Sequence, residues 1–194
     1  MGSSSDDPEI SRHQLEGQLV ISAHHAKYVV DASVLVKWFL HQQEADRDRA
    51  LALRELHISG RSTIFVPQLA QLEVLNAIRF SPKAKEEDGE LALEALQDLH
   101  LETKPTEPDL VRKANAIAWA YKITIYDALY VALAEQVGYP LITADEVMMK
   151  KLKGHSIVLP LRELDFKGRR RELRSRFACG KTRVDNSCPI LSWK

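Results

Sequence analysis

Four acidic residues each stand inside or directly after an apolar stretch of the chain: Asp31, Glu73, Asp127 and Asp145. Burying one unpaired carboxylate costs free energy, and carboxylates that lie close together raise each other's pKa values. A divalent cation removes both penalties, and Mg²⁺ and Mn²⁺ prefer oxygen ligands. We therefore predict that these four carboxylates together bind Mg²⁺ or Mn²⁺.

Asp31 and Glu73 are difficult to explain as purely structural residues. Asp31 directly follows an apolar pair, and Ser33 competes with it for the N-cap position of the helix that comes next. Glu73 falls in the middle of a predicted helix, and residues 69–78 contain no other charge. A solvent-facing helix surface usually carries several charged residues, so the pattern favours a functional role for Glu73.

Asp127 and Asp145 each have a local structural explanation as well. Thr124 precedes Asp127 by three residues and Thr143 precedes Glu146 by three, and both spacings are typical of a capping box. Residues 128–134 are apolar nearly all round, which predicts a core helix that begins with Asp127 at the buried mouth of the sheet. For these two acids the capping and metal-binding interpretations both stay open.

Two other kinds of site are disfavoured by the sequence. The seven histidines are scattered, and the two cysteines, Cys179 and Cys188, do not have the spacing of a zinc site. The chain contains no glycine-rich phosphate loop, which weighs against a P-loop NTPase or a dinucleotide-dependent enzyme. Carboxylate chemistry is therefore the main signal.

Strands and helices alternate along the part of the chain that carries these acids. Strands are predicted at 28–31, 63–66, 101–104, 140–143 and 156–159, and helices at 33–40, 44–57, 67–80, 84–98, 107–121, 124–136 and 145–152. We expect Ser33 to cap the first helix and Pro67 to lie in the first turn of the third. The alternation predicts an α/β fold, a three-layer α/β/α sandwich with a central, mainly parallel sheet. Ligands bind beyond the carboxyl ends of such strands.

Charge and composition divide the chain into three parts. The 194 residues include 27 Lys+Arg and 27 Asp+Glu, but residues 1–160 hold 17 basic and 23 acidic residues, whereas residues 161–194 hold 10 and 4. We expect a loose leader over 1–27, one folded domain over 28–163 and a flexible basic tail over 164–194. No apolar run approaches the roughly 20 residues that cross a bilayer, and the late cysteines fit a reducing cytoplasm.

Four segments of the sequence, taken in order, resemble the PIN domain and in particular the VapC-type toxin ribonucleases. They are residues 29–39 (Val-Val-Asp-Ala-Ser-Val-Leu-Val-Lys-Trp-Phe), 72–76 (Leu-Glu-Val-Leu-Asn), 126–134 (Tyr-Asp-Ala-Leu-Tyr-Val-Ala-Leu-Ala) and 141–146 (Leu-Ile-Thr-Ala-Asp-Glu). The resemblance covers about residues 28–163. It leaves the leader and the basic tail outside the family pattern.

The resemblance implies a site, a reaction and partners. The acidic metal site would comprise Asp31, Glu73, Asp127 and Asp145, with Ser33 and Thr143 as accessory polar groups and Asn76 and Glu146 as further candidates. The implied reaction is hydrolysis of RNA phosphodiester bonds with Mg²⁺ or Mn²⁺, in which a nearby carboxylate accepts a proton from water. A homodimer is implied, as is a small VapB-type antitoxin whose C-terminal segment fills the acidic cleft.

Three other functions are weighed against this one. A PIN nuclease that processes RNA without an antitoxin shares the same residues, and a neighbouring antitoxin reading frame would separate the two. A non-catalytic RNA-binding protein is disfavoured because all four acids are present. A phosphotransfer enzyme with a strand-end aspartate nucleophile is disfavoured because position 33, where haloacid-dehalogenase-like enzymes have a second aspartate, is Ser33. The basic tail either binds RNA phosphates or is a solvated segment.

Overall fold

The computed structural model of this protein describes residues 25–40 and 45–164. The first strand begins at Ala26, two residues before the predicted start and inside the segment expected to be a leader. The rest of that leader and the basic tail from residue 165 onward lie outside the described residues. Within the described ranges, no helix is long and apolar enough to cross a bilayer.

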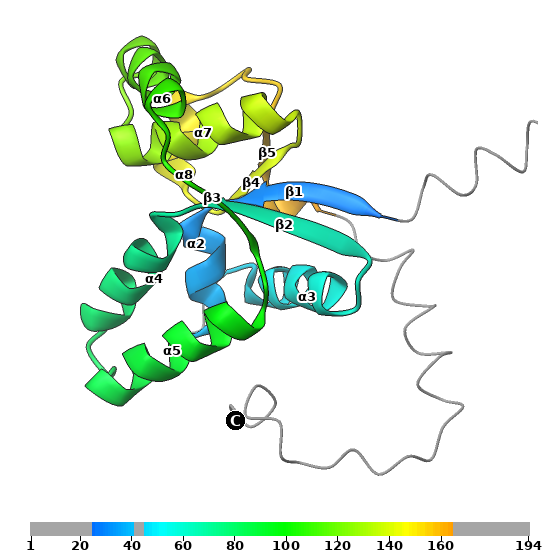
Figure 1. The fold of residues 1–194 in the computed structure, drawn as a ribbon, viewed down its shortest axis with the longest axis vertical. Helices are drawn as coiled ribbons and strands as arrows, with labels where there is room; N and C mark the ends of the chain where they lie inside the picture. Colours follow the sequence, from blue (N-terminus) through cyan, green and yellow to red (C-terminus); the bar gives the residue numbers. More distant parts are fainter. Residues whose placement is uncertain (1–24, 41–44, 165–194) are drawn as a thin grey trace, which may run out of the picture.

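A five-stranded parallel sheet forms the centre of the domain (Figure 1). Its strands are β1 (Ala26–Val30), β2 (Ser62–Pro67), β3 (Glu102–Lys104), β4 (Leu141–Thr143) and β5 (Val158–Pro160), in the spatial order β3-β2-β1-β4-β5. The strand order reverses direction between β1 and β4, where Val30 pairs with Ile142. Such a reversal leaves a crevice at the carboxyl ends of the two strands, which is where ligands bind in open α/β sheets.

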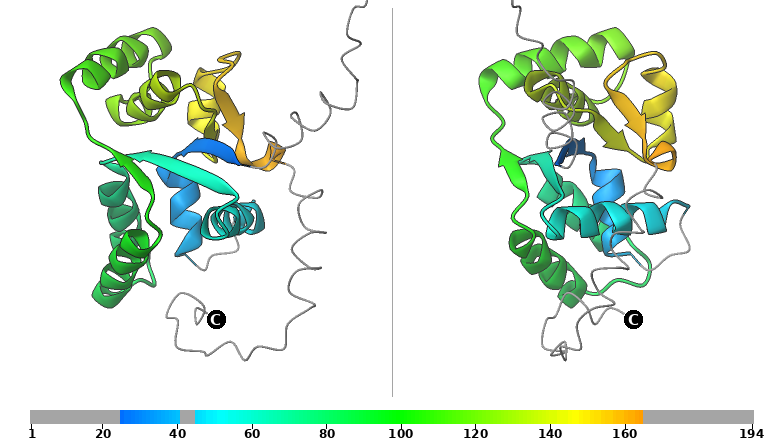
Figure 2. Two further views of the ribbon diagram at one scale, coloured as in Figure 1. Left: turned by 45° about the vertical axis from the view of Figure 1, so that its right-hand side comes forward. Right: turned by 90° about the vertical axis from the view of Figure 1, so that its right-hand side faces the viewer.

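Helices cover both faces of the sheet, which confirms the predicted three-layer sandwich (Figures 1 and 2). One face carries α2 (Ala32–Leu35), α3 (Arg47–Ile58), α4 (Ala70–Arg79) and α5 (Glu86–Asp98), and the other carries α6 (Pro108–Tyr121), α7 (Ile125–Val137) and α8 (Glu146–Lys151). Two 3₁₀ turns, η1 (Val36–Trp38) and η2 (Leu161–Glu163), complete the described elements. The two groups of helices follow from right-handed crossovers that run in opposite directions from β1.

The core is continuous from the sheet into α7. Val29, Val30, Ile64 and Ile142 are fully buried in three adjacent strands, and all seven residues 128–134 of α7 are buried. The prediction of a core helix after Asp127 is therefore confirmed. Because α7 is packed on all sides, its first turn is held firmly at the edge of the sheet where β1 and β4 end.

Two expectations about helix starts are wrong. Ser33 does not cap the first helix: Asp31 occupies the N-cap position, and its carbonyl accepts the N–H groups of Val34 and Leu35 at 3.0 and 3.3 Å. Pro67 is the last residue of β2 and not part of α4, which begins at Ala70. Pairing with Lys104 keeps Pro67 in β2, at the end of the strand and beyond Phe65, the last residue of β2 that pairs with β1.

Candidate active site

Asp31 lies at the carboxyl end of β1 and is the centre of the site. Asp31 is buried, with only 5% of the residue exposed. Its carboxylate accepts no hydrogen bond from the N–H groups at the start of α2. Ser33 Oγ donates to Asp31 Oδ2 at 2.5 Å, and Thr143 Oγ1 donates to the same oxygen at 2.8 Å. Thr143 ends β4 and is fully buried. The two strands at the reversal point are therefore joined through one carboxylate oxygen.

The two hydroxyl groups around Asp31 are themselves oriented by the backbone. Ser33 Oγ accepts the N–H of Ala144 at 3.0 Å, and Thr143 Oγ1 accepts the N–H of Asp145 at 3.0 Å. A hydroxyl that accepts from a backbone N–H has its single hydrogen left to donate, and here each donates to Asp31. The predicted accessory roles of Ser33 and Thr143 therefore have a structural basis as supports of this carboxylate.

Glu73 on α4 is held from the opposite face of the sheet by Tyr130 on α7. The Tyr130 hydroxyl donates to Glu73 Oε2 at 2.6 Å. Burial of this phenol, with Asp31 and Glu73 close by, raises its pKa well above the ordinary range, so the hydroxyl keeps its proton. Tyr130 was not among the predicted site residues. Its one signal in the sequence is that it carries the only polar atom of the side chains in the apolar run 128–134.

Burial and mutual repulsion disfavour the charged forms of two of the acids. Burial is the main cause that raises the pKa of Asp31, opposed by the hydrogen bonds from Ser33 and Thr143, and the charges of Asp127 and Asp145 add to the increase. The pKa of Glu73 rises to about 7, mainly through burial, while Tyr130 opposes the shift and the charges of Asp31 and Asp127 add to it. Asp31 and Glu73 therefore each experience the charges of two other predicted acids.

Asp127 and Asp145 occupy the first turns of α7 and α8. The N–H of Asp127 donates to Thr124 Oγ1 at 3.1 Å, so the threonine half of the expected capping box forms. At α8, the expected capping box of Thr143 with Glu146 is wrong, because Thr143 belongs to β4 and Asp145 is itself the N-cap. Asp145 Oδ1 accepts the N–H groups of Val147 and Met148 at 2.7 and 3.0 Å.

The two further candidates lie apart from this network. Asn76 is exposed on α4 and makes no side-chain hydrogen bond to any residue that the structure describes. Glu146 is exposed at the start of α8, where its carboxylate pairs with Arg162 at 3.0 Å. Hydrogen bonds thus join Asp31 to Ser33 and Thr143. The charges of Asp127 and Asp145 act on Asp31, and the charge of Asp31 acts on Glu73, whereas Asn76 and Glu146 take no part in these interactions.

The donor set suits a hard divalent cation. Asp31 and Glu73 each use one carboxylate oxygen in hydrogen bonds, and Asp145 uses Oδ1 alone, so each keeps a second oxygen with no partner in the described ranges. No lysine or arginine of residues 25–40 and 45–164 forms an ion pair with any of the four acids. Within those same ranges, no three metal-ligating side chains already lie in a ready-made cluster. The residues fit Mg²⁺ or Mn²⁺ by chemistry and charge.

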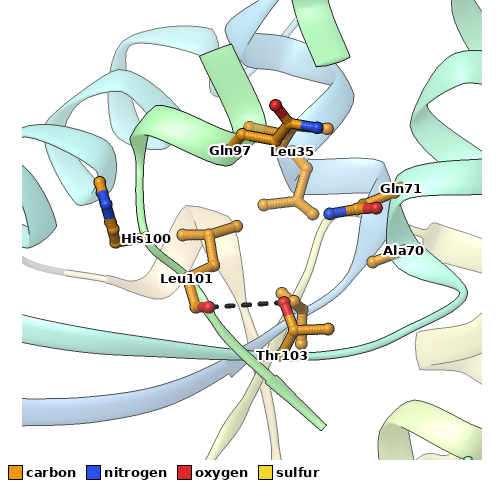
Figure 3. A pocket seen from close by; sticks show the side chains of 9 residues that line it. Leu35, Ala70, Gln71, Gln97, His100, Leu101 and Thr103 are labelled. Atoms are coloured by element: carbon orange, nitrogen blue, oxygen red, sulfur yellow. Dashed lines mark hydrogen bonds between the residues drawn. The ribbon is translucent and has the colours of Figure 1, made fainter. Parts of the chain in front are cut away.

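A separate cavity lies on the other side of α4 and does not belong to this site. It has a volume of about 220 Å³ between α4, α5 and β3, and its walls include Leu35, Leu101, Gln71 and Gln97 (Figure 3). None of the four acids lines it. Its floor is apolar and its rim carries neutral carboxamides, which is a poor environment for holding a cation.

The site and its scaffold have recognisable relatives. A sequence profile of the PIN domain matches residues 28–154, which is more than half of the chain. The chain belongs to the PIN domain family. As a PIN domain, it is 30% identical over 129 residues to Ribonuclease VapC3 of Pyrobaculum aerophilum, covering 64% of this chain and 94% of that protein. It is also 38% identical over 120 residues to Ribonuclease VapC1 of Mycobacterium tuberculosis, covering 60% and 84%.

Solved structures resemble this PIN domain in fold. A toxin–antitoxin complex from Klebsiella pneumoniae aligns with a TM-score of 0.54 at 18% identity, covering 71% of this chain and 99% of that chain. VapBC2 of Rickettsia felis, solved bound to a DNA fragment from its promoter, aligns with a TM-score of 0.51 at 16% identity, covering 69% and 98%. At these identities the similarity establishes the shared fold.

The raised pKa of Glu73 predicts a specific dependence of stability on pH. Because its pKa is about 7 in the folded state and 4.5 ordinarily, the folded protein binds a proton that the unfolded chain releases between these values. Its contribution to the free energy of unfolding therefore falls as pH rises through that window. We therefore expect the stability of Glu73→Gln relative to that of wild type to increase from about pH 5 to about pH 8. The measurement is urea unfolding of both proteins in EDTA at these two pH values.

The matched control is Glu94→Gln, which changes an exposed glutamate on α5. Its stability difference from wild type should be nearly the same at both pH values. If the Glu73→Gln difference is equally constant, the raised pKa of Glu73 is wrong.

Substitutions at Asp145 separate its capping role from its charge. Asp145→Ala removes the acceptor of two N–H groups at the start of α8 and should cost about 1 kcal/mol of stability without metal. Asp145→Asn keeps an acceptor there and should melt close to wild type without metal. Both variants should lose much of the Mn²⁺-induced rise in melting temperature. If Asp145→Asn keeps the full rise in melting temperature, Asp145 acts only as a helix cap and is not a metal ligand.

Proposed function

We propose that the protein is a metal-dependent endoribonuclease that hydrolyses RNA phosphodiester bonds, and that it is the toxin of a VapBC-type toxin–antitoxin module. The observation that carries this proposal is the buried Asp31 carboxylate at the strand reversal, whose pKa is raised by its burial and by the charges of Asp127 and Asp145. Membership of the PIN domain family and the similarity to two proteins named as VapC ribonucleases support it.

Each residue of the site has a role in the proposed reaction. Asp31, Glu73, Asp127 and Asp145 would hold Mg²⁺ or Mn²⁺, which supplies activation of water and stabilisation of charge on the phosphate. Ser33 and Thr143 fix the direction of the Asp31 carboxylate. A nearby carboxylate would accept a proton from the water, and the neutral Tyr130 hydroxyl holds Glu73 in place.

The proposed partner is a small VapB-type antitoxin whose C-terminal segment fills the acidic cleft. The similarity in fold to toxin–antitoxin complexes agrees with such a partner. The second candidate function, a PIN nuclease that processes RNA without an antitoxin, has the same site. A short reading frame for an antitoxin beside the gene separates the two. In either case the enzyme would act in the cytoplasm, where its RNA substrate lies.

The proposed homodimer is supported by apolar side chains that face solvent on two helices. Leu72 and Phe80 on α4 are 69% and 76% exposed, and Val111 and Trp119 on α6 are 38% and 79% exposed. Helices that expose several large apolar residues commonly form protein–protein interfaces. We assign these residues to the contact between two copies of the chain.

The nuclease proposal predicts the effect of one conservative substitution. Asp31→Asn keeps the shape of the side chain and its hydrogen bonding to Ser33 and Thr143, so the fold should persist. It removes the central negative charge, and RNA cleavage with Mn²⁺ or Mg²⁺ should fall by at least about 100-fold. The measurement is cleavage of total RNA and defined oligonucleotides by full-length protein. Undiminished cleavage by a folded Asp31→Asn protein would remove Asp31 from the site.

The dimer proposal predicts a change in mass in solution. Trp119→Arg places a charge in the proposed interface and should convert the protein from dimer to monomer, measured by analytical ultracentrifugation. The control is Ile58→Arg, which changes a residue that is 51% exposed on α3, away from α4 and α6. A Trp119→Arg protein with the mass of the wild-type dimer would contradict the assignment of α6 to the interface.

A further inference from the structure

A group of exposed lysines surrounds the point where α6 ends and α7 begins. Lys151 Nζ donates to the carbonyl of Lys122 at 2.7 Å, which holds the end of α8 against this turn. Lys122, Lys150 and Lys153 are exposed beside that contact. We call these three residues the lysine corner. Lys151 is left out of the definition because its charge already caps the carboxyl end of α6.

The charges of the lysine corner are not neutralised by neighbouring acids. Within residues 25–40 and 45–164, none of its three lysines forms an ion pair. Two acids of the neighbouring helices have other partners: Glu135 on α7 pairs with Lys113 and His155, and Glu146 on α8 pairs with Arg162. Exposed positive charges without counter-charges attract a polyanion.

An exposed aromatic residue connects this corner to the acidic site. Tyr126, in the first turn of α7, is 59% exposed and directly precedes Asp127. It lies four residues after Lys122. Aromatic rings that face solvent beside basic residues are the usual platforms on which single-stranded nucleic acids stack their bases.

Two of the acids lie close in sequence to the lysine corner. Lys122, the C-cap of α6, precedes Asp127 in α7 by five residues. Asp145 caps the start of α8 and Lys150 lies in its last turn, and the five residues from acid to lysine correspond to about 7.5 Å along the helix axis. Figure 1 shows α6, α7 and α8 together on one side of the sheet. A strand of RNA whose cleaved phosphate lies at the acids therefore has its neighbouring nucleotides within reach of the corner.

We propose that the lysine corner binds backbone phosphates of single-stranded RNA on one side of the cleaved bond, and that Tyr126 stacks on an adjacent base. This inference rests on the proposed ribonuclease function. It assigns the substrate path to residues outside the acidic site. The observations that carry it are the unpaired lysines, the exposed ring and their common connection to Asp127 and Asp145.

The charge part of the proposal is tested by the salt dependence of RNA binding. The triple substitution Lys122→Gln, Lys150→Gln and Lys153→Gln is made in full-length Asp31→Asn protein, so that the RNA stays intact. Affinity for a labelled single-stranded RNA is measured by fluorescence anisotropy at several salt concentrations. The slope of log K against log salt should become shallower by about 0.7 per lysine, or about 2 in total.

The matched control removes three positive charges elsewhere: Arg79→Gln, Lys83→Gln and Lys85→Gln around the connection between α4 and α5. Its slope should stay close to that of the parent protein. If both triple variants lose affinity and slope equally, the effect is one of total charge and the lysine corner is not a binding surface. Retained RNA affinity together with a loss of dimer mass would assign the corner to protein contact and overturn the proposal.

The stacking part is tested by cleavage kinetics with Asp31 intact. Tyr126→Ala should raise KM by roughly tenfold with kcat nearly unchanged, whereas Tyr126→Phe should behave like wild type. Ile58→Ala, at a residue that is 51% exposed on α3, is the control. An unchanged KM for Tyr126→Ala overturns the stacking role. If the wild-type protein cleaves no RNA, the ribonuclease proposal itself fails, which is a different result.

Discussion

The burial of one carboxylate, Asp31, is the constraint on which the architecture of the site depends. An ionised carboxylate in an apolar environment is costly unless hydrogen bonds or a cation compensate it. The fold supplies two hydroxyl donors from opposite sides of the strand reversal, Ser33 after β1 and Thr143 at the end of β4. Both donors reach the same oxygen only because β1 and β4 are adjacent and parallel. The strand order therefore makes it possible for both hydroxyl groups to stabilise the ionised form of Asp31.

Compensation of Asp31 is incomplete, and this leaves the site poised for a cation. Burial and the charges of Asp127 and Asp145 raise the pKa of Asp31 by more than its hydrogen bonds lower it, so the net shift is upward. Glu73 is in the same position, since its single bond from Tyr130 does not offset its burial. A site that satisfied every carboxylate with protein donors would be more stable but would have no free oxygen for a ligand. The unfavourable burial of the charged carboxylates is thus part of their proposed function.

The sequence predicted most of the fold, and it singled out the four acids as a proposed site, because both inferences depend on local patterns. Alternating apolar runs define strands and helices, and a carboxylate inside an apolar run is visible without any structure. Contacts between distant segments were not predictable in this way. Tyr130 meets Glu73 across 57 residues, and no periodicity specifies that pair. The capping box expected at Thr143 failed for a related reason: the Thr143 hydroxyl donates to Asp31, 112 residues away in the chain, and Asp145 caps α8 with its own side chain.

Charge placement also explains why the balanced composition of 27 basic and 27 acidic residues is uninformative about RNA. The four acids would repel phosphate unless a cation neutralised them, whereas the lysine corner would attract phosphate with or without that cation. Recognition of an RNA strand would therefore divide into two physically different contacts. The contact at the acids depends on the divalent cation, and the contact at the lysines depends on monovalent salt through counterion release. Because Asp145 and Lys150 belong to the same short helix, the fold would fix the distance between the two contacts.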